Sequence, residues 1–218
     1  REKKIVGCIP YLDNYVYFDR NGIFVEGDMT RDTAVPFFDG IQVKKVIRDE
    51  KLPIKDTVLN TAVALAKRWG ADETDAARAG ILHDITKALD GPLQLTLCQA
   101  YGKMLDDFSR KYPKTLHALT GSLVAQRIFG ENEAVVSAIE SHTTGKANMN
   151  LLETIIYVAD YMEPNRDFPG VERLRELAFS DIRAALKLGL EMTLEHLAEQ
   201  GGEVSPASRE ALAYLNAQ

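Results

Sequence analysis

The sequence predicts a mainly α-helical protein with a small β-rich segment at its N-terminus. A helical apolar periodicity begins near residue 57 and recurs to the C-terminus. Helix N-cap signals at Ser180-Asp181 and Ser205-Pro206 fall between the periodic stretches. Residues 1–53 lack that periodicity and combine short β-prone runs with turn signals. We therefore divide the chain into a β-rich segment, residues 1–53, and a helical domain, residues 54–218.

The β-rich segment contains two strand-like runs, Tyr15–Phe18 and Ile23–Glu26, on either side of the turn signal Arg20-Asn21-Gly22. This arrangement predicts a β-hairpin. A further apolar run, VPFFDGIQVKKVI, follows and is broken by Asp39-Gly40.

The helical domain is expected to hold seven or eight helices. Residues 58–70 carry an apolar stripe that stops at Gly70, and a second stretch has Pro92 near its first turn. The other helix-like stretches are Thr74–Leu82 and residues 117–130, 131–143, 151–162, 171–179, 180–200 and 205–217.

Composition excludes several functional classes. The 218 residues are 45% hydrophobic, enough for one ordinary core. The net charge of -6 argues against a nucleic-acid or membrane-surface binder, which would need a basic face. Cys8 and Cys98 are far apart and form no CxxC, so a reduced setting is expected. No apolar run approaches the roughly 18–20 residues of a membrane span.

Three of the four histidines lie where predicted helices end or begin. His83-Asp84 follows AARAGIL, His117 opens HALTGSLVA and His142 closes AVVSAIESH. Asp160 lies in the apolar run IIYVADYM, where burying an unpaired carboxylate is costly. A metal ion is one partner that would satisfy it. Taken alone, the His83-Asp84 pair could equally be an ordinary surface or capping pair.

These histidines and aspartates form a mixed imidazole and carboxylate set, which suits Fe, Mn, Zn or Co better than Ca or Mg. An Asp between two groups of His ligands can bridge two ions, and such a site is suited to attack on phosphorus. Thr143, Thr144, Gly145 and Lys146 follow His142 and would form a rim that contacts phosphate oxygens. The alternative is a solvated loop. His196 lies in an amphipathic context and is interpreted as structural.

The segments HDITK, HALTG, ESHTTG and YVADYMEPNRDFPGV, in this order, resemble the HD-domain superfamily of metal-dependent phosphohydrolases. Within it, SHTTG together with ADYMEPNRDFPGVERLRELA is similar to the YqeK-type branch. That branch hydrolyses dinucleoside tetraphosphates symmetrically, so that diadenosine tetraphosphate gives two ADP. The resemblance extends from about Val58 to the C-terminus.

The resemblance implies an HD-type helical bundle that holds two transition-metal ions, with iron expected first and Mn, Co or Zn as alternatives. The residues that match metal ligands are His83, Asp84, His117, His142 and Asp160. Asp84 would bridge the ions, and Asp84, His117 and Lys87 would act in catalysis. Lys87 would also face the substrate phosphate, with Arg166 neutralising phosphate charge or anchoring the loop through Glu163.

The sequence departs from the family pattern at one expected ligand. Family members carry a further His in a pattern like HTxGVxxTA, and that position falls on Ile54 here. Ile cannot ligate a metal, and Asp56 is two residues along and so lies on a different helix face. We expect weaker affinity for the first ion and lower activity.

Residues 1–53 loosely resemble part of the extracytoplasmic β domain of the bacterial division family DivIB/FtsQ. This segment is interpreted as a fusion, a gene-boundary artefact or a recombinant, or alternatively as an unfamiliar β appendage.

Three functions are compared. The first is symmetrical dinucleoside tetraphosphate hydrolysis by metal-activated hydroxide, with ADP or GDP as product. The second is an HD-type activity on another nucleotide, such as a mononucleotide or a cyclic nucleotide. The third is a catalytically impaired module that binds ADP or GDP, motivated by Ile54. The nucleotide substrate and the lack of a signal segment predict a cytoplasmic location, with no nucleic-acid or membrane partner. The resemblance also makes a homodimer an expectation.

Overall fold

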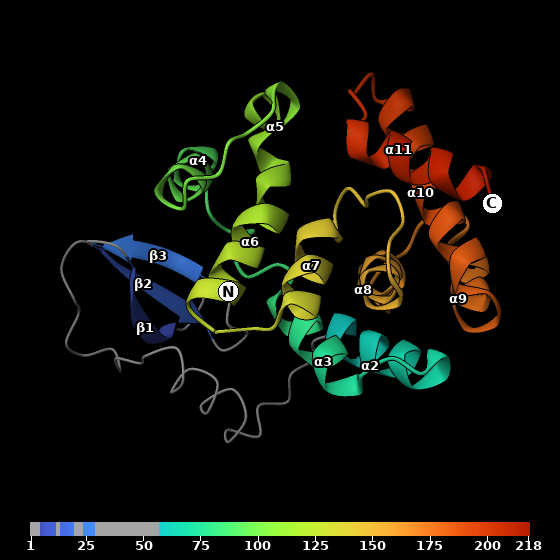
Figure 1. Ribbon diagram of the computed structural model, residues 1–218, viewed down its shortest axis with the longest axis horizontal. Helices are drawn as coiled ribbons and strands as arrows, with labels where there is room; N and C mark the ends of the chain where they lie inside the picture. The colour runs from blue at the N-terminus through green and yellow to red at the C-terminus, as the bar shows by residue number, and fades with distance from the viewer. Residues whose placement is uncertain (1–4, 12–13, 20–23, 29–56) are drawn as a thin grey trace.

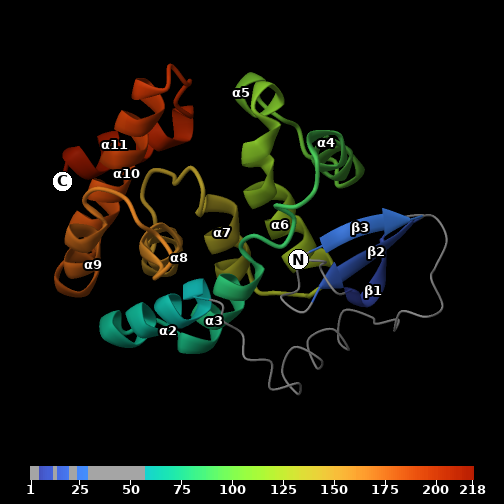
Figure 2. The same cartoon turned by 180° about the vertical axis from the view of Figure 1, so that it is seen from behind.

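The computed structural model describes residues 5–11, 14–19, 24–28 and 57–218. The predicted mainly α-helical architecture is confirmed (Figure 1). Helix α8, Leu151–Met162, is seen end-on near the middle of the helical bundle, and Figure 2 shows the same arrangement from behind. No helix in the described part of the chain is both long and apolar enough to cross a bilayer.

Three N-terminal strands form an antiparallel sheet in the order β1-β2-β3. Their bounds are β1 Ile5–Tyr11, β2 Asn14–Asp19 and β3 Phe24–Asp28. Strands β2 and β3 pair Tyr15 with Asp28 and Phe18 with Phe24, in agreement with the predicted hairpin. The apolar run VPFFDGIQVKKVI and the expected boundary between residues 53 and 54 lie outside the described residues.

The helical bundle contains ten α-helices among the described residues, more than the seven or eight expected. In chain order they are α2 Thr57–Trp69, α3 Glu73–Leu82, α4 Gly91–Ala100, α5 Asp107–Lys111, α6 Leu116–Arg127, α7 Glu133–Ser141, α8 Leu151–Met162, α9 Val171–Ser180, α10 Ile182–Glu199 and α11 Pro206–Asn216, with a short 3-10 turn η1 at Pro113–Thr115. Helix α5 has five residues, too few to show an apolar period.

Side-chain caps fix where most of these helices begin. Asp72, Asp90, Asp106, Asn132 and Asn150 each accept a hydrogen bond from the backbone N–H three residues later. Before α8 the cap is reciprocal, because the Glu153 side chain also accepts from the Asn150 N–H. Asp181 caps α10 as predicted, whereas the Ser205 hydroxyl makes no capping bond before α11. The Asn150 cap therefore fixes the residue at which α8 begins.

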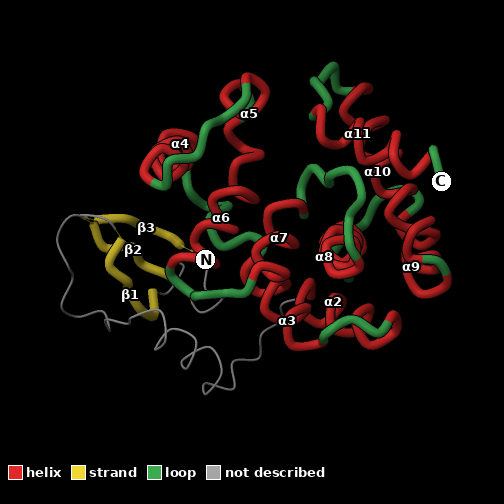
Figure 3. The backbone as a smooth tube through the Cα atoms, viewed as in Figure 1, coloured by secondary structure: helices red, strands yellow, loops and turns green. Residues whose placement is uncertain are grey.

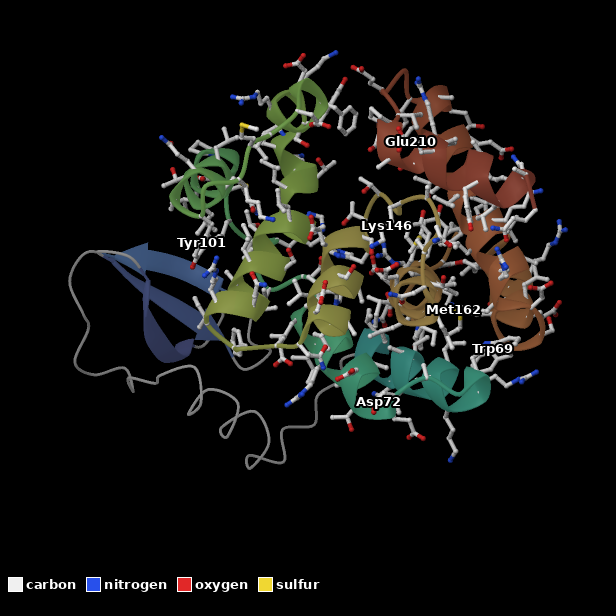
Figure 4. The ribbon with its side chains drawn as sticks, in the orientation of Figure 1. Trp69, Asp72, Tyr101, Lys146, Met162 and Glu210 are labelled. Carbon is white, nitrogen blue, oxygen red and sulfur yellow. The ribbon has the colours of Figure 1, made fainter. Side chains whose placement is uncertain are left out.

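The core is built around α8, which packs against α2, α3, α7 and α10. Its central residues, Ile155 to Ala159, are almost completely buried. A helix that is apolar on every side belongs inside a bundle. At its C-terminal end the Trp69 indole, on α2, donates to the Ala178 carbonyl at 2.7 Å, and Figure 4 shows Trp69 close to Met162 at the end of α8. This hydrogen bond joins α2 to α9.

Helices α2 and α3 approach closely at Gly80. A Cβ atom at this position would lie 2.9 Å from the Leu59 Cα and 3.2 Å from the Leu59 nitrogen, which are backbone atoms. Only glycine allows this approach without moving a helix. The contact matters for function because α3 ends at the His83-Asp84 pair.

Replacing Gly80 by Ala should destabilise the protein. Helix propensity alone favours Ala by about 0.8–1.0 kcal/mol. Overpacking against backbone costs about 1–3 kcal/mol and should outweigh that gain. Chemical unfolding monitored by circular dichroism measures the change. Gly189→Ala in α10 is the matched control, because the nearest neighbours of its added Cβ lie at 3.5 Å. Equal stability changes in the two variants would contradict the close-approach argument.

Candidate metal centre

Four separate elements bring the five predicted ligands to one place. His83 and Asp84 follow α3, and His117 lies in the first turn of α6. His142 follows α7, and Asp160 lies in the last turn of α8. The three imidazoles are buried, and Asp84 and Asp160 are partly buried. Residues from four segments of the chain therefore converge on one polar centre inside an apolar bundle.

All three imidazoles are oriented by the same backbone contact. Each Nδ1 lies 2.7 Å from the carbonyl oxygen three residues earlier, which belongs to Gly80, Lys114 or Ile139. A carbonyl oxygen can only accept, so Nδ1 carries the proton. In the neutral ring Nε2 then presents a lone pair toward the centre. This is the arrangement in which histidine ligates metals, with its second nitrogen held by an outer hydrogen bond.

The first side of the centre is formed by Asp84, His117 and His142. Asp84 Oδ1 lies 3.3 Å from His117 Nε2 and 3.5 Å from His142 Nε2, and the two imidazole nitrogens are 3.2 Å apart. These three atoms are close enough together to share one ion. Among the described residues, the buried Asp84 Oδ1 has no hydrogen-bond partner.

The other side of the centre is formed by the second oxygen of the same carboxylate. Asp84 Oδ2 lies 3.3 Å from His83 Nε2, which is in turn 3.8 Å from Asp160 Oδ1. The two oxygens of Asp84 thus face two different groups of potential ligands. The bridging role predicted for Asp84 is compatible with this geometry and stays a prediction.

The carboxylates of the centre are ionised. Burial alone would raise the pKa of Asp84, but the His142 and His83 side chains hold this pKa well below its ordinary value. Burial likewise opposes ionisation of Asp160, yet the neighbouring imidazoles and Arg166 lower its pKa. Two negative charges are therefore held in a place of limited solvent access, where a cation is strongly favoured.

The histidines differ in their response to these charges. Burial and the neighbouring His142 lower the pKa of His117 to about 4, so His117 is neutral at pH 7. Burial also disfavours a charged His83, but Asp84 and Asp160 outweigh it and raise the pKa of His83. His117 is thus a neutral imidazole that can ligate a metal. The carboxylates beside His83 favour positive charge at that position.

A divalent transition metal fits this set of residues. Imidazole lone pairs and ionised carboxylate oxygens point at one another, and a buried carboxylate oxygen is left without a donor. Such a group is costly unless a cation satisfies it. The donor types match Fe, Mn, Co or Zn. His83, Asp84, His117, His142 and Asp160 would hold the ions.

Two basic side chains contact the carboxylates. Lys87 Nζ lies 2.7 Å from Asp84 Oδ2, and Lys87 is half exposed. Arg166 Nη2 lies 2.8 Å from Asp160 Oδ1, and its Nε donates to the Asp160 carbonyl at 3.0 Å. Arg166 Nε is also 3.8 Å from Glu163 Oε1, which agrees with the expected anchoring of this loop.

Arg175 is a residue that sequence reasoning missed. From α9 its guanidinium donates to the carbonyls of Met162 at 3.0 Å, Glu163 at 3.1 Å and Arg166 at 2.8 Å. It therefore holds the loop that carries Arg166 beside Asp160. The sequence gives no signal for this role, because a basic residue in an amphipathic helix is ordinary.

The loop after His142, drawn as a tube between α7 and α8 in Figure 3, divides into two parts. Thr143 Oγ1 lies 3.1 Å from both His117 Nε2 and His142 Nε2. The Thr144 carbonyl instead accepts from Ser208 on α11 at 2.7 Å, and the next residue, Gly145, packs beneath α10 and α11. Of the rim residues, Thr143 is the one placed at the histidines.

Lys146, labelled in Figure 4, is paired with side chains of α7 and α8. Its Nζ lies 2.7 Å from Glu153 Oε1 and donates to Ser137 Oγ at 2.9 Å. It also lines a hollow of about 310 Å³ together with Asn148 and Tyr214. These contacts do not favour the phosphate-binding role expected for Lys146, and they have a structural explanation.

Two further expectations concern residues away from the centre. His196 lies on the exposed side of α10, where its Nε2 is 2.9 Å from Gln200 Nε2, in keeping with a structural residue. Ile54, which replaces an expected ligand, lies outside the described residues.

Known proteins resemble the chain in both sequence and fold. The model of the HD domain family matches residues 57–165, which is half of the chain. Symmetrical bis(5'-nucleosyl)-tetraphosphatases of Bacillus subtilis and Halalkalibacterium halodurans are each 40% identical over 150 residues, 68% of this chain and 80% of theirs. A crystal structure of an HD superfamily hydrolase from Clostridium acetobutylicum, described as involved in NAD metabolism, aligns with a TM-score of 0.75. It is 35% identical and covers 83% of this chain and 98% of its own.

The family match spans the segments that carry all five candidate ligands. HD domains bind divalent metals, and Asp84, His117 and His142 form a possible metal site here. The chain belongs to the HD-domain family of metal-dependent phosphohydrolases.

Proposed function

We propose that the protein hydrolyses dinucleoside tetraphosphates symmetrically, converting diadenosine tetraphosphate and one water into two ADP. The observation that carries the proposal is the convergence of two imidazole Nε2 atoms on the buried Asp84 Oδ1, for which the described part of the chain offers no hydrogen-bond donor. The 40% identity with symmetrical tetraphosphatases supports the choice of substrate.

The reaction breaks the central phosphoanhydride bond. The water oxygen joins an inner phosphorus, the bridging oxygen leaves with the other half, and each product is an ADP. Divalent ions held by the five ligands would supply Lewis acidity and a nucleophile at neutral pH. We propose iron as the metal, and the imidazole and carboxylate donors support it without excluding Mn, Co or Zn.

The side chains around the ligands have separate roles in this proposal. Lys87, whose side chain is half exposed, would leave Asp84 to contact a phosphate oxygen. The Thr143 hydroxyl faces the same side of the centre and would orient the incoming phosphate group. Arg166 keeps Asp160 ionised and in place, because it bonds both the carboxylate and the carbonyl of that residue.

The proposal also includes a location and a chain organisation. We place the enzyme in the cytoplasm, where its nucleotide substrate is found, and we propose a homodimer on the family resemblance. We further propose that residues 54–218 form the catalytic domain and that residues 1–53 are a separate β-rich segment. The match of the HD model, which begins at residue 57, supports this division.

A second candidate is a nucleotide-binding module of reduced activity. Ile54 stands where a ligand is expected. On the same side of the centre, Lys87 and Arg166 already neutralise Asp84 Oδ2 and Asp160 Oδ1. This favours weak binding of the ion on that side. Such a module would bind ADP without turnover.

We expect ADP as the only product from diadenosine tetraphosphate, because symmetrical attack gives identical halves. Anion-exchange chromatography of the reaction mixture, with an anaerobically purified sample, separates ADP from AMP and ATP. AMP with ATP would contradict the symmetrical assignment. A metal-loaded protein without turnover would favour the second candidate.

His142→Ala should lose metal and activity together. It removes one of the two imidazoles that face Asp84 Oδ1, and leaves that oxygen with a single nitrogen neighbour. Metal content by inductively coupled plasma mass spectrometry should fall by about one ion per chain. His196→Ala is the matched control, since its imidazole lies outside the centre. Retention of full metal content by His142→Ala would show that the ligands lie elsewhere.

Lys87→Ala and Lys146→Ala should separate phosphate binding from loop stability. Removing one charged donor that contacts the reacting phosphate costs on the order of 100-fold in rate. We therefore expect kcat/KM to fall by about that factor in Lys87→Ala. Lys146→Ala should chiefly lower the melting temperature, because it removes the basic partner of the buried Glu153 carboxylate and leaves only the hydrogen bonds from Ser137 and Asn150. Equal losses of kcat/KM in both variants would show that Lys146 also contacts the substrate phosphate.

A further inference from the structure

Three buried polar side chains meet beneath the turn that carries the His83-Asp84 pair. They are Thr86 in this turn, Gln94 on α4 and Thr120 on α6. Thr86 and Thr120 are completely buried, and Gln94 is 2% exposed. Buried polar groups are costly unless hydrogen-bonded, so three of them in one place require an explanation.

The three side chains form a closed ring of hydrogen bonds. The Gln94 Nε2 group donates to the Thr86 carbonyl at 2.7 Å, which fixes the orientation of the amide. Its Oε1 must then accept from the Thr120 hydroxyl. The Thr86 hydroxyl lies 2.8 Å from Thr120 Oγ1 and 2.9 Å from the His117 carbonyl, and it donates its single proton to one of these two acceptors. Donation to Thr120 closes the ring through the Thr86 backbone carbonyl, and donation to His117 also ties Thr86 to α6.

The ring connects the two segments that carry opposing ligands. Thr86 lies two residues after Asp84, and Thr120 lies three residues after His117. The Thr86 hydroxyl also reaches the backbone of His117 itself. Nearby, a Cβ at Gly121 would lie 3.3 Å from the His83 carbonyl, so α6 and the turn are in close contact. The Asp84 and His117 backbones are therefore held at a fixed separation.

Simple packing does not account for this choice of residues. Apolar side chains of the same volume would fill the same space without the cost of burying four polar groups. A fully satisfied buried network instead fixes one geometry, because any displacement breaks several directional bonds at once. A ligand pair that must accept one ion needs such a fixed separation.

We propose that the ring of Thr86, Gln94 and Thr120 positions Asp84 relative to His117 and so sets the affinity of the centre for a divalent metal. This inference rests on the metal centre of the proposed function. The three residues are positioning residues, since they touch neither the ion nor the substrate. Outer-shell partners of metal ligands typically contribute about 10–100-fold in affinity.

The test is a Mn²⁺ titration of the metal-free protein by isothermal calorimetry. Thr86→Val and Thr120→Val keep the volume and remove the hydroxyl. Each should weaken Mn²⁺ binding on the order of tenfold at a temperature where circular dichroism shows a folded protein. Thr86→Ser keeps the hydroxyl and should keep the parent affinity. The double Val variant should lose little more than one single variant, because either change opens the ring.

Thr193→Val is the matched control. Its hydroxyl donates to the Gly189 carbonyl at 2.9 Å within α10, away from the centre. It should lower stability without changing Mn²⁺ affinity. Unchanged Mn²⁺ affinity in folded Thr86→Val and Thr120→Val would overturn the proposal and make the ring purely structural. If these two variants do not fold, Gln94→Met tests the same proposal. Weaker Mn²⁺ binding is expected, and an unchanged Mn²⁺ affinity would overturn the proposal.

The parent protein separates this inference from the proposed function. A parent protein that binds Mn²⁺ but forms no ADP would contradict the proposed activity. The ratio of the Mn²⁺ affinities of variant and parent would still test the role of the ring. A parent that does not bind Mn²⁺ would overturn both.

Discussion

The centre depends on one partly buried carboxylate, that of Asp84. Asp84 places an oxygen between two imidazole nitrogens, in a region of limited solvent access and without a hydrogen-bond donor among the described residues. Burial of an ionised carboxylate is expensive unless positive charge compensates it. The imidazoles cannot offer a proton while neutral, because each Nδ1–H is already donated to a backbone carbonyl. The geometry that is poor for hydrogen bonding is suited to a cation.

The fold brings the ligands of this carboxylate centre together at the ends of helices. The three imidazoles belong to residues at the end of α3, the start of α6 and the end of α7, where a turn of backbone offers a carbonyl to Nδ1. Helix α8 contributes Asp160 from its last turn and is held by core contacts on every side. Elements far apart in sequence therefore deliver ligands to one point.

Much of this was predictable from the sequence. Helical periodicity gave the bundle, and the positions of His83, His117 and His142 at the ends of periodic stretches indicated a shared site. Asp160 was identified because a carboxylate in an apolar run needs a partner. The short α5 was missed, because five residues do not show a period.

Other features depend on contacts that no local pattern records. Lys146 was expected to contact phosphate because it belongs to the polar run that follows His142. Its partner is Glu153, which caps the next helix. Nothing in the local sequence distinguishes Arg175 or Gln94. The fold places Arg175 against the Arg166 carbonyl and Gln94 against the Thr86 carbonyl. Tertiary packing determines such roles, so a single sequence does not predict them.

The most direct test of the account is an anomalous-difference map from crystals grown with Mn²⁺. The account predicts a strong peak within coordinating distance of Asp84 Oδ1, His117 Nε2 and His142 Nε2. A map whose strong peaks all lie away from these three atoms would contradict it.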